Sequence, residues 1–103
     1  MNRVEQLLPK VKANLILQHD DDDNLLRGFI RAALDYAENY QKTKFGRRKL
    51  APATEQAVIM LSSHLYESRD GSTAGFFSDY VGSVPNVWQT VNRLLNLGKV
   101  WEV

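Results

Sequence analysis

The sequence predicts an all-α fold, a small bundle of about four helices, two long and two short, in one domain over residues 1–103. Apolar residues recur every three or four positions, which gathers them on one face of a helix. Pro52 and Pro85 each stand where such a stretch begins, as proline does in a first helical turn. No segment alternates apolar and polar residues for more than a few positions, so no strand of useful length is predicted.

Composition excludes several classes of protein. Apolar residues make up 44% of the chain and charged residues 24%, which is typical of a globular domain. The net charge of +1 excludes a strong attraction of the whole molecule to DNA or to an anionic membrane. The absence of cysteine excludes disulfides, thiolate zinc sites and cysteine nucleophiles. No apolar run nears ~18 residues and no signal sequence is recognised, so we expect a soluble protein of intracellular origin.

The N-terminal half holds a short helix and a long one. The short helix is expected within residues 1–17, with Pro9 in its first turn and with Val11, Leu15 and, as a further candidate, Ile16 facing inward. Residues 19–24 form a turn that starts the second helix. That long helix is expected over residues 22–42. Its inward face is Leu26, Phe29, Ile30, Ala33, Ala37 and Tyr40.

The C-terminal half holds the other two helices. A long helix opens at Pro52 and runs toward Arg69, with an inward face of Ala57, Val58, Leu61, Leu65 and the candidate His64. A long loop rich in Gly and Ser follows over residues 70–83. The last, short helix is expected from Pro85 to about Asn96, ending at Gly98. Residues 98–103 are then an extended C-terminal tail.

The aspartates at 20–23 resemble the start of a calcium loop. An EF-hand loop that begins at Asp20 needs Gly at its sixth position and Glu at its twelfth, where this chain has Leu25 and Arg31. We therefore interpret Asp22 or Asp23 as the cap of the long helix, with the neighbouring carboxylates at the favourable end of the helix dipole.

No catalytic or cofactor-binding constellation is recognised. His64 and Glu67 lie one turn apart, but a di-metal bundle needs a second such pair, and the other histidine, His19, lies in a turn. Ser62, Ser63 and His64 are adjacent and so point to different faces of a helix. We interpret His64 as a packed structural histidine, and we expect no enzyme activity, no metal and no cofactor.

Three segments remain as candidate contact surfaces. Arg47, Arg48 and Lys49 form the basic cluster, which is either a solvated loop or a weak contact to phosphates. The loop aromatics Phe76, Phe77 and Tyr80, with Trp101 in the tail, either fold onto their own core or meet a partner. The candidate anchor in the tail comprises Lys99, Val100, Trp101 and Val103.

The order of these pieces resembles the head–tail connector (adaptor) family of long-tailed bacteriophages and prophages. The resemblance spans about Val11 to Trp101. Its most distinctive piece is the closure of the Pro52 helix on Tyr66-Glu67-Ser68-Arg69. The family often has an arginine near the end of the last helix, where this chain has Gly98-Lys99. The other matched positions are Val11-Lys12, Leu15, residues 19–24, Leu26, Phe29-Ile30, Ala32-Ala33, Tyr36, Glu38, Tyr40, Ala57, His64-Leu65, Val84-Pro85 and Leu94-Leu95.

The resemblance implies a non-enzymatic structural protein of the virion. Family members form a ring, commonly twelvefold, below the portal; the ring extends the DNA channel and docks the next neck or tail-completion protein. The C-terminal segment of the family tends to engage the portal. The resemblance further implies that the protein is made in the host cytoplasm and then resides at the head–tail junction.

On this basis we assign subunit contacts to Phe76, Phe77 and Tyr80, and portal docking to the tail anchor. The basic cluster is assigned to the channel or the portal, where it meets passing DNA without sequence preference. The alternative is a small helical nucleic-acid-binding regulator, although residues 44–51 match a helix-turn-helix turn poorly. A metal-dependent helical enzyme is a third possibility.

Overall fold

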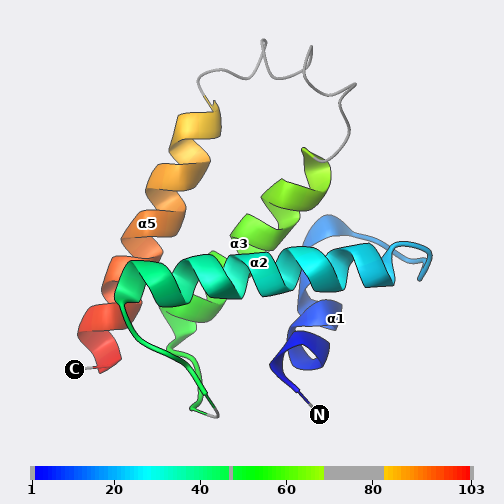
Figure 1. The fold of residues 1–103 in the computed structure, drawn as a ribbon. Coiled ribbons are helices and arrows are strands. Elements are labelled where there is room, and N and C mark those ends of the chain that lie inside the picture. The colour runs from blue at the N-terminus through cyan, green and yellow to red at the C-terminus, as the bar shows by residue number, and fades with distance from the viewer. Residues whose placement is uncertain (1, 47, 69–82, 103) are drawn as a thin grey trace.

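A computed structural model describes residues 2–46, 48–68 and 83–102. It contains four helices, α1 (Arg3–Leu15), α2 (Asp23–Gln41), α3 (Pro52–Glu67) and α5 (Ser83–Glu102), and no strand within those residues (Figure 1). The predicted all-α bundle is confirmed. Most of the segment predicted as a long loop, 70–83, lies outside the described residues.

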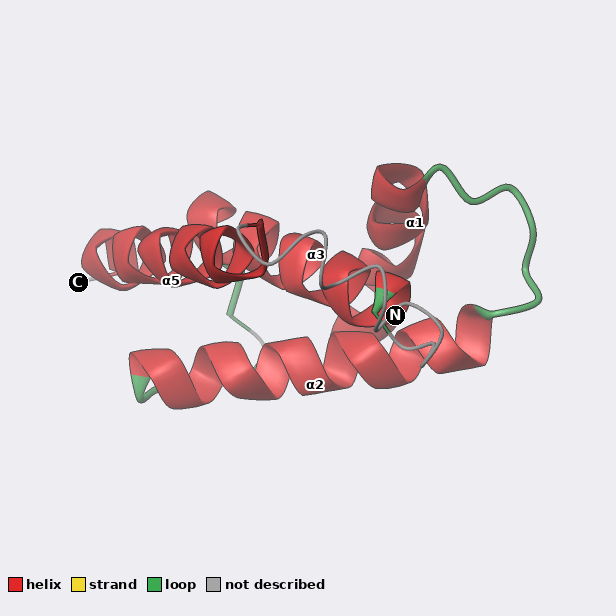
Figure 2. Ribbon diagram, turned by 90° about the horizontal axis from the view of Figure 1, so that it is seen from above, coloured by secondary structure: helices red, strands yellow, loops and turns green. Residues whose placement is uncertain are grey.

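The helices form two layers. α3 is central, because the two most extensive helix contacts, with α5 and with α2, both involve it and it also packs against α1. Seen from above, α2 lies along one side of the row formed by α1, α3 and α5 (Figure 2). The molecule measures 41 × 31 × 19 Å, so its short dimension is about two helix diameters. The result is a flat slab with several exposed edges.

The core lies between the two layers and follows the predicted apolar faces. Leu26, Ile30, Ala33 and Ala37 of α2 are buried, while Phe29 and Tyr40 are partly buried. From α3, Ala57, Val58 and Leu61 are buried, and Leu65 packs at the margin. The periodicity of these two helices therefore predicted the core correctly. Other buried apolar residues are Leu7, Leu8, Val11, Phe45, Leu50, Ile59, Tyr66, Val91 and Leu95.

α1 begins earlier than predicted. The Asn2 side chain accepts a hydrogen bond of 2.9 Å from the Glu5 backbone N–H and so caps the helix at Arg3. Pro9 consequently lies inside the helix rather than in its first turn. Pro9 is exposed, so its ring displaces no core side chain, although its missing N–H leaves the carbonyl one turn earlier without its helical donor. Ile16 does not face inward; it is 80% exposed.

α5 is longer than predicted and continues through Gly98 to Glu102. The predicted extended tail is therefore helical over residues 98–102. A Cβ at position 98 would lie 1.9 Å from Thr54 Oγ1. Glycine is present here because α5 approaches α3 too closely for any side chain, and not because the helix ends.

A buried polar contact joins three helices near Gly98. The Gln41 side-chain amide, at the end of α2, donates to Thr54 Oγ1 of α3 at 2.9 Å and to the Leu95 carbonyl of α5 at 2.8 Å. Both Gln41 and Thr54 are buried. Hydrogen bonds of this kind fix the relative position of helices, since losing one partner leaves a buried polar group unsatisfied.

Candidate assembly surfaces

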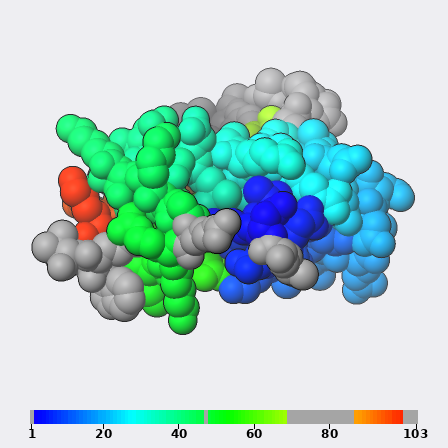
Figure 3. Space-filling model, turned by 60° about the horizontal axis from the view of Figure 1, so that its bottom comes forward, coloured from blue at the N-terminus to red at the C-terminus, as the bar shows by residue number. Residues whose placement is uncertain are grey.

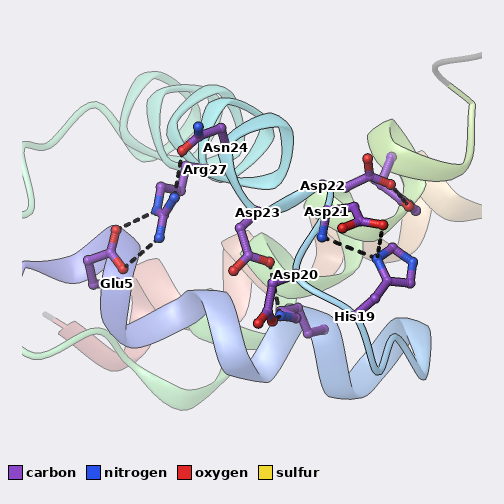
Figure 4. Close-up of polar contacts among 10 residues, drawn as sticks. Glu5, His19, Asp20, Asp21, Asp22, Asp23, Asn24 and Arg27 are labelled. Atoms are coloured by element: carbon purple, nitrogen blue, oxygen red, sulfur yellow. Dashed lines mark hydrogen bonds and ion pairs between the residues drawn. The ribbon is translucent and has the colours of Figure 1, made fainter.

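The first candidate surface is the acidic turn, residues 19–24 between α1 and α2. Lys12 of α1 binds two aspartates of the turn: its ammonium group donates to Asp20 and lies 2.9 Å from Asp23 Oδ1. Figure 4 shows the aspartates of the turn and their polar contacts. The hydrogen bond from Lys12 lowers the pKa of Asp20 below its ordinary 3.8, and the two carboxylates raise the pKa of Lys12 above 10.5. The carboxylates of Asp20 and Asp21 nevertheless project outward, with side chains 85% and 92% exposed.

Two further contacts fix the turn. Arg27 of α2 donates to Glu5 Oε1 at 2.6 Å and to Asn24 Oδ1 at 2.6 Å, which ties α2 to α1. Asp22 occupies the N-cap position of α2 as predicted, but its carboxylate makes no capping hydrogen bond. It accepts instead from the hydroxyl of the buried Tyr66 in α3.

The contact between Asp22 and Tyr66 joins two segments that the sequence analysis singled out separately, the acidic run and the end of the Pro52 helix. Three of the four aspartates bind side chains of α1 or α3, while the carboxylate of Asp21 lies 4.0 Å from His19 in the turn itself. Within the described residues, no group of three or more His, Cys, Asp or Glu side chains is arranged to hold a metal ion. The acidic turn is thus a negatively charged edge that contacts with α1 and α3 hold in place.

The second candidate surface is the basic groove, of about 350 Å³, between α1 and residues 48–55. Arg3 donates to the Arg48 carbonyl, and its guanidinium group lies 5.7 Å from the centre of the Phe45 ring. Lys10 donates to Glu55 of α3. The groove is lined by Arg3, Gln6, Leu7, Lys10, Arg48, Lys49, Leu50 and Glu55.

Part of the predicted basic cluster lines this groove. Arg48 donates to Thr43 Oγ1 at 2.9 Å and to the Lys44 carbonyl at 3.1 Å, so its guanidinium group braces the loop after α2. Lys49 is exposed at the rim, and Arg47 lies outside the described residues. The groove therefore combines Arg48 and Lys49 with cations of α1.

His64 packs against α5 as a structural histidine. Its ring lies edge-to-face with Trp88, with ring centroids 6.2 Å apart. Trp88 in turn meets Tyr36 edge-to-face at 5.3 Å, and the Tyr36 hydroxyl donates to Asn92 at 2.7 Å. His64 thus belongs to an aromatic contact between α2, α3 and α5, which confirms the interpretation as a packed histidine.

The other predicted contact residues are not brought together here. Phe76, Phe77, Tyr80 and Val103 lie outside the described residues. Val100 and Trp101 lie on the last turn of α5 by their backbone, next to the exposed Lys99. One turn earlier, Leu97 is 61% exposed.

Several surface residues escaped the sequence analysis. Lys10 and Glu55 are 45 residues apart, so their pairing follows from the packing of α1 on α3 and has no local signal. Ile16 had a signal that was misread. It follows the last helical residue, Leu15, and its backbone is left-handed, so it leaves the helical periodicity on which the inward prediction depended.

The comparisons agree with the predicted family. The family model for phage gp6-like head–tail connector proteins matches residues 5–97, which include the acidic turn, the basic groove from Gln6 onward and most of α5. No curated protein and no solved structure matches the chain. No helix of the described residues is long and apolar enough to cross a membrane. With the family model matching most of its length and its fold a four-helix bundle, the chain belongs to the phage gp6-like head–tail connector family and is a structural component of the phage head–tail junction.

Proposed function

We propose that the protein forms a ring below the portal, joins the phage head to the tail and extends the DNA channel, without enzymatic activity. The observation that carries this proposal is the family match over residues 5–97. The ring is proposed to be twelvefold. The protein is made in the host cytoplasm and takes up its place at the head–tail junction of the virion.

The shape of the subunit supports a ring. Ring closure requires two different surface patches on each copy, which meet in a head-to-tail manner. A slab of 41 × 31 × 19 Å offers separate edges for such contacts. The loop aromatics Phe76, Phe77 and Tyr80 are proposed to add apolar area to the contact between subunits.

The end of α5 is the proposed portal contact. Lys99 is exposed and Leu97 is 61% exposed just before it, and Val100, Trp101 and Val103 follow in the sequence. The backbone of Lys99, Val100 and Trp101 lies in α5, so this part of the proposed anchor belongs to the end of a helix. Several copies in a ring bind through effective concentration, so each anchor needs only a few apolar side chains.

Two further faces of the ring meet the DNA channel and the tail. Arg47, Arg48 and Lys49 are proposed to face the channel or the portal and to touch passing DNA without sequence preference. A net charge of +1 suits a channel wall, because a strongly cationic wall would retain the moving DNA. The next neck or tail-completion protein docks on the side opposite the portal.

Co-sedimentation with purified portal tests the function. The wild-type chain is expected to sediment with portal rings, and Trp101→Ser is expected to weaken this binding. Gln89→Ser, at an exposed position of the same helix, is the matched control and should bind normally. Circular dichroism checks that both variants remain helical. A wild-type chain that ignores the portal would contradict the proposal.

A further inference from the structure

We propose that the acidic turn of one copy docks in the basic groove of the next copy. This inference rests on the proposed function in one respect only, that copies of the chain assemble with one another. It identifies the two patches of the head-to-tail contact: residues 19–24 on one subunit, and the groove between α1 and residues 48–55 on its neighbour.

The first support is charge complementarity. The groove is lined by four cations, Arg3, Lys10, Arg48 and Lys49, against one carboxylate, Glu55. The acidic turn carries four consecutive aspartates, of which Asp20 and Asp21 have side chains 85% and 92% exposed. Opposite patches of this kind steer association and fix its register.

The second support is Ile16, which adjoins the acidic turn. Its backbone is left-handed, with φ of 58°, and its side chain is 80% exposed. Glycine or asparagine ordinarily occupies this position after a helix, because a branched side chain is unfavourable there. Ile16 is therefore unfavourable in two ways: a branched residue has a positive φ, and a large apolar side chain is exposed to water. Residues with such local conflicts are typical of functional contacts.

The groove meets the neighbouring copy mainly through its charged side chains. Its apolar lining residues, Leu7 of α1 and Leu50, are only 3% and 7% exposed and belong to the core of their own subunit. Ile16 therefore packs on the aliphatic parts of the lining Lys and Arg side chains, while the aspartates meet their charged ends.

The two patches lie on different parts of the molecule. Figure 3 shows the start of α1 (dark blue) against the segment that includes residues 48–55 (green), with the connection between α1 and α2 (lighter blue) toward the other end. In a linear assembly of copies, the acidic turn of one end subunit and the basic groove of the other end subunit therefore remain unoccupied. Association can continue until a ring closes.

Nucleic acid is a less suitable occupant of the groove, so for Arg48 and Lys49 this inference replaces the contact with channel DNA proposed above. Glu55 lines it and binds Lys10, so a phosphate would meet a carboxylate inside the site. Binding of duplex DNA that is abolished by Lys49→Glu, in the absence of any contact between copies, would overturn the proposal in favour of that alternative.

Disulfide trapping tests the contact directly, because the natural chain has no cysteine. One variant carries Asp21→Cys and the other Lys49→Cys, and they are mixed under oxidising conditions, both free and bound to portal. The control replaces Lys49→Cys by Arg31→Cys, at an exposed position of α2. We expect several-fold more disulfide-linked heterodimer from the first mixture than from the control. We also expect 1 M salt to lower the yield, because it screens exposed charges.

Other outcomes are decisive as well. Equal yields in the two mixtures overturn the proposal. Dominant Asp21→Cys homodimers also overturn it, because they require a symmetric contact between acidic turns. Wild-type binding to the portal with trapping at the control level would refute only the docking contact. Loss of portal binding by the wild-type chain would refute the proposed function itself.

Discussion

The close approach of α5 to α3 makes Gly98→Ala the sharpest test of the fold. The added methyl group would lie 1.9 Å from Thr54 Oγ1 and 3.1 Å from Gln41 Nε2, so the threonine hydroxyl must move away from its donor. Overpacking costs about 1–3 kcal/mol, and the weakened buried hydrogen bond adds about 1 kcal/mol. The higher helix propensity of alanine offsets about 1 kcal/mol of this destabilisation.

We therefore expect Gly98→Ala to lower the free energy of unfolding by about 1–3 kcal/mol, measured by urea denaturation followed by circular dichroism. Gly28→Ala is the control, because a Cβ at that helical position meets no atom within 4 Å. It should stabilise the protein by about 0.5–1 kcal/mol. Stabilisation by both substitutions would refute the close approach.

Thr54→Ala separates the clash from other effects of the new methyl group. Thr54→Ala removes the hydroxyl that the new methyl group of Gly98→Ala would overlap. The loss in free energy of unfolding of the double variant should therefore be smaller than the sum of the two single losses, by about 1 kcal/mol. Additive costs would mean that residues 54 and 98 are not in contact.

Three further predictions follow from the acidic turn. Tyr66→Phe removes the donor to Asp22 and should lower the free energy of unfolding by about 1–2 kcal/mol in the same assay; an unchanged value would mean that α3 does not hold the turn. Ile16→Asn relieves the left-handed strain and should raise the free energy of unfolding of the monomer by about 1 kcal/mol, while reducing contact between copies in the trapping assay. The pKa of Asp20 is lowered in the folded protein, so the unfolded chain binds more protons there, and stability should fall as the pH drops below 3.8. Urea denaturation between pH 2 and 5 should show a shallower fall for Lys12→Met, and identical curves would contradict the ion pair.

The long helices were predictable because their signal is local. The apolar positions of α2 repeat at helical spacing, and Leu26, Ile30, Ala33 and Ala37 among them are buried. Pro52 likewise marks the start of α3 correctly. In both cases the backbone preference and the packing of the core favour the same structure, so the sequence alone was sufficient.

The helix ends were less predictable because packing overrides local preference there. Local preference predicts a helix start at Pro9 and a helix end at Gly98, yet both residues lie inside helices. Asn2 caps α1 ahead of Pro9, and the hydroxyl of Thr54 requires glycine at position 98. Neither contact follows from the residues adjacent to the proline or the glycine.

The candidate surfaces were predictable only in part. The acidic run and Arg48-Lys49 were evident from their charge, but the contribution of α1 to the basic groove was not. Arg3 reaches the Arg48 carbonyl and Lys10 reaches Glu55 across 45 residues, and such pairing depends on how α1 packs. The connector family, in contrast, was predicted correctly from the order of the motifs along the chain, and the family match over residues 5–97 confirmed it.

Electron cryomicroscopy of portal mixed with this protein tests the central claim most directly. The account predicts a closed ring of subunits on the portal, with the acidic turn of each copy against the basic groove of the next. A portal without a bound ring would contradict the connector function, and a ring whose neighbours meet through other surfaces would contradict the docking contact.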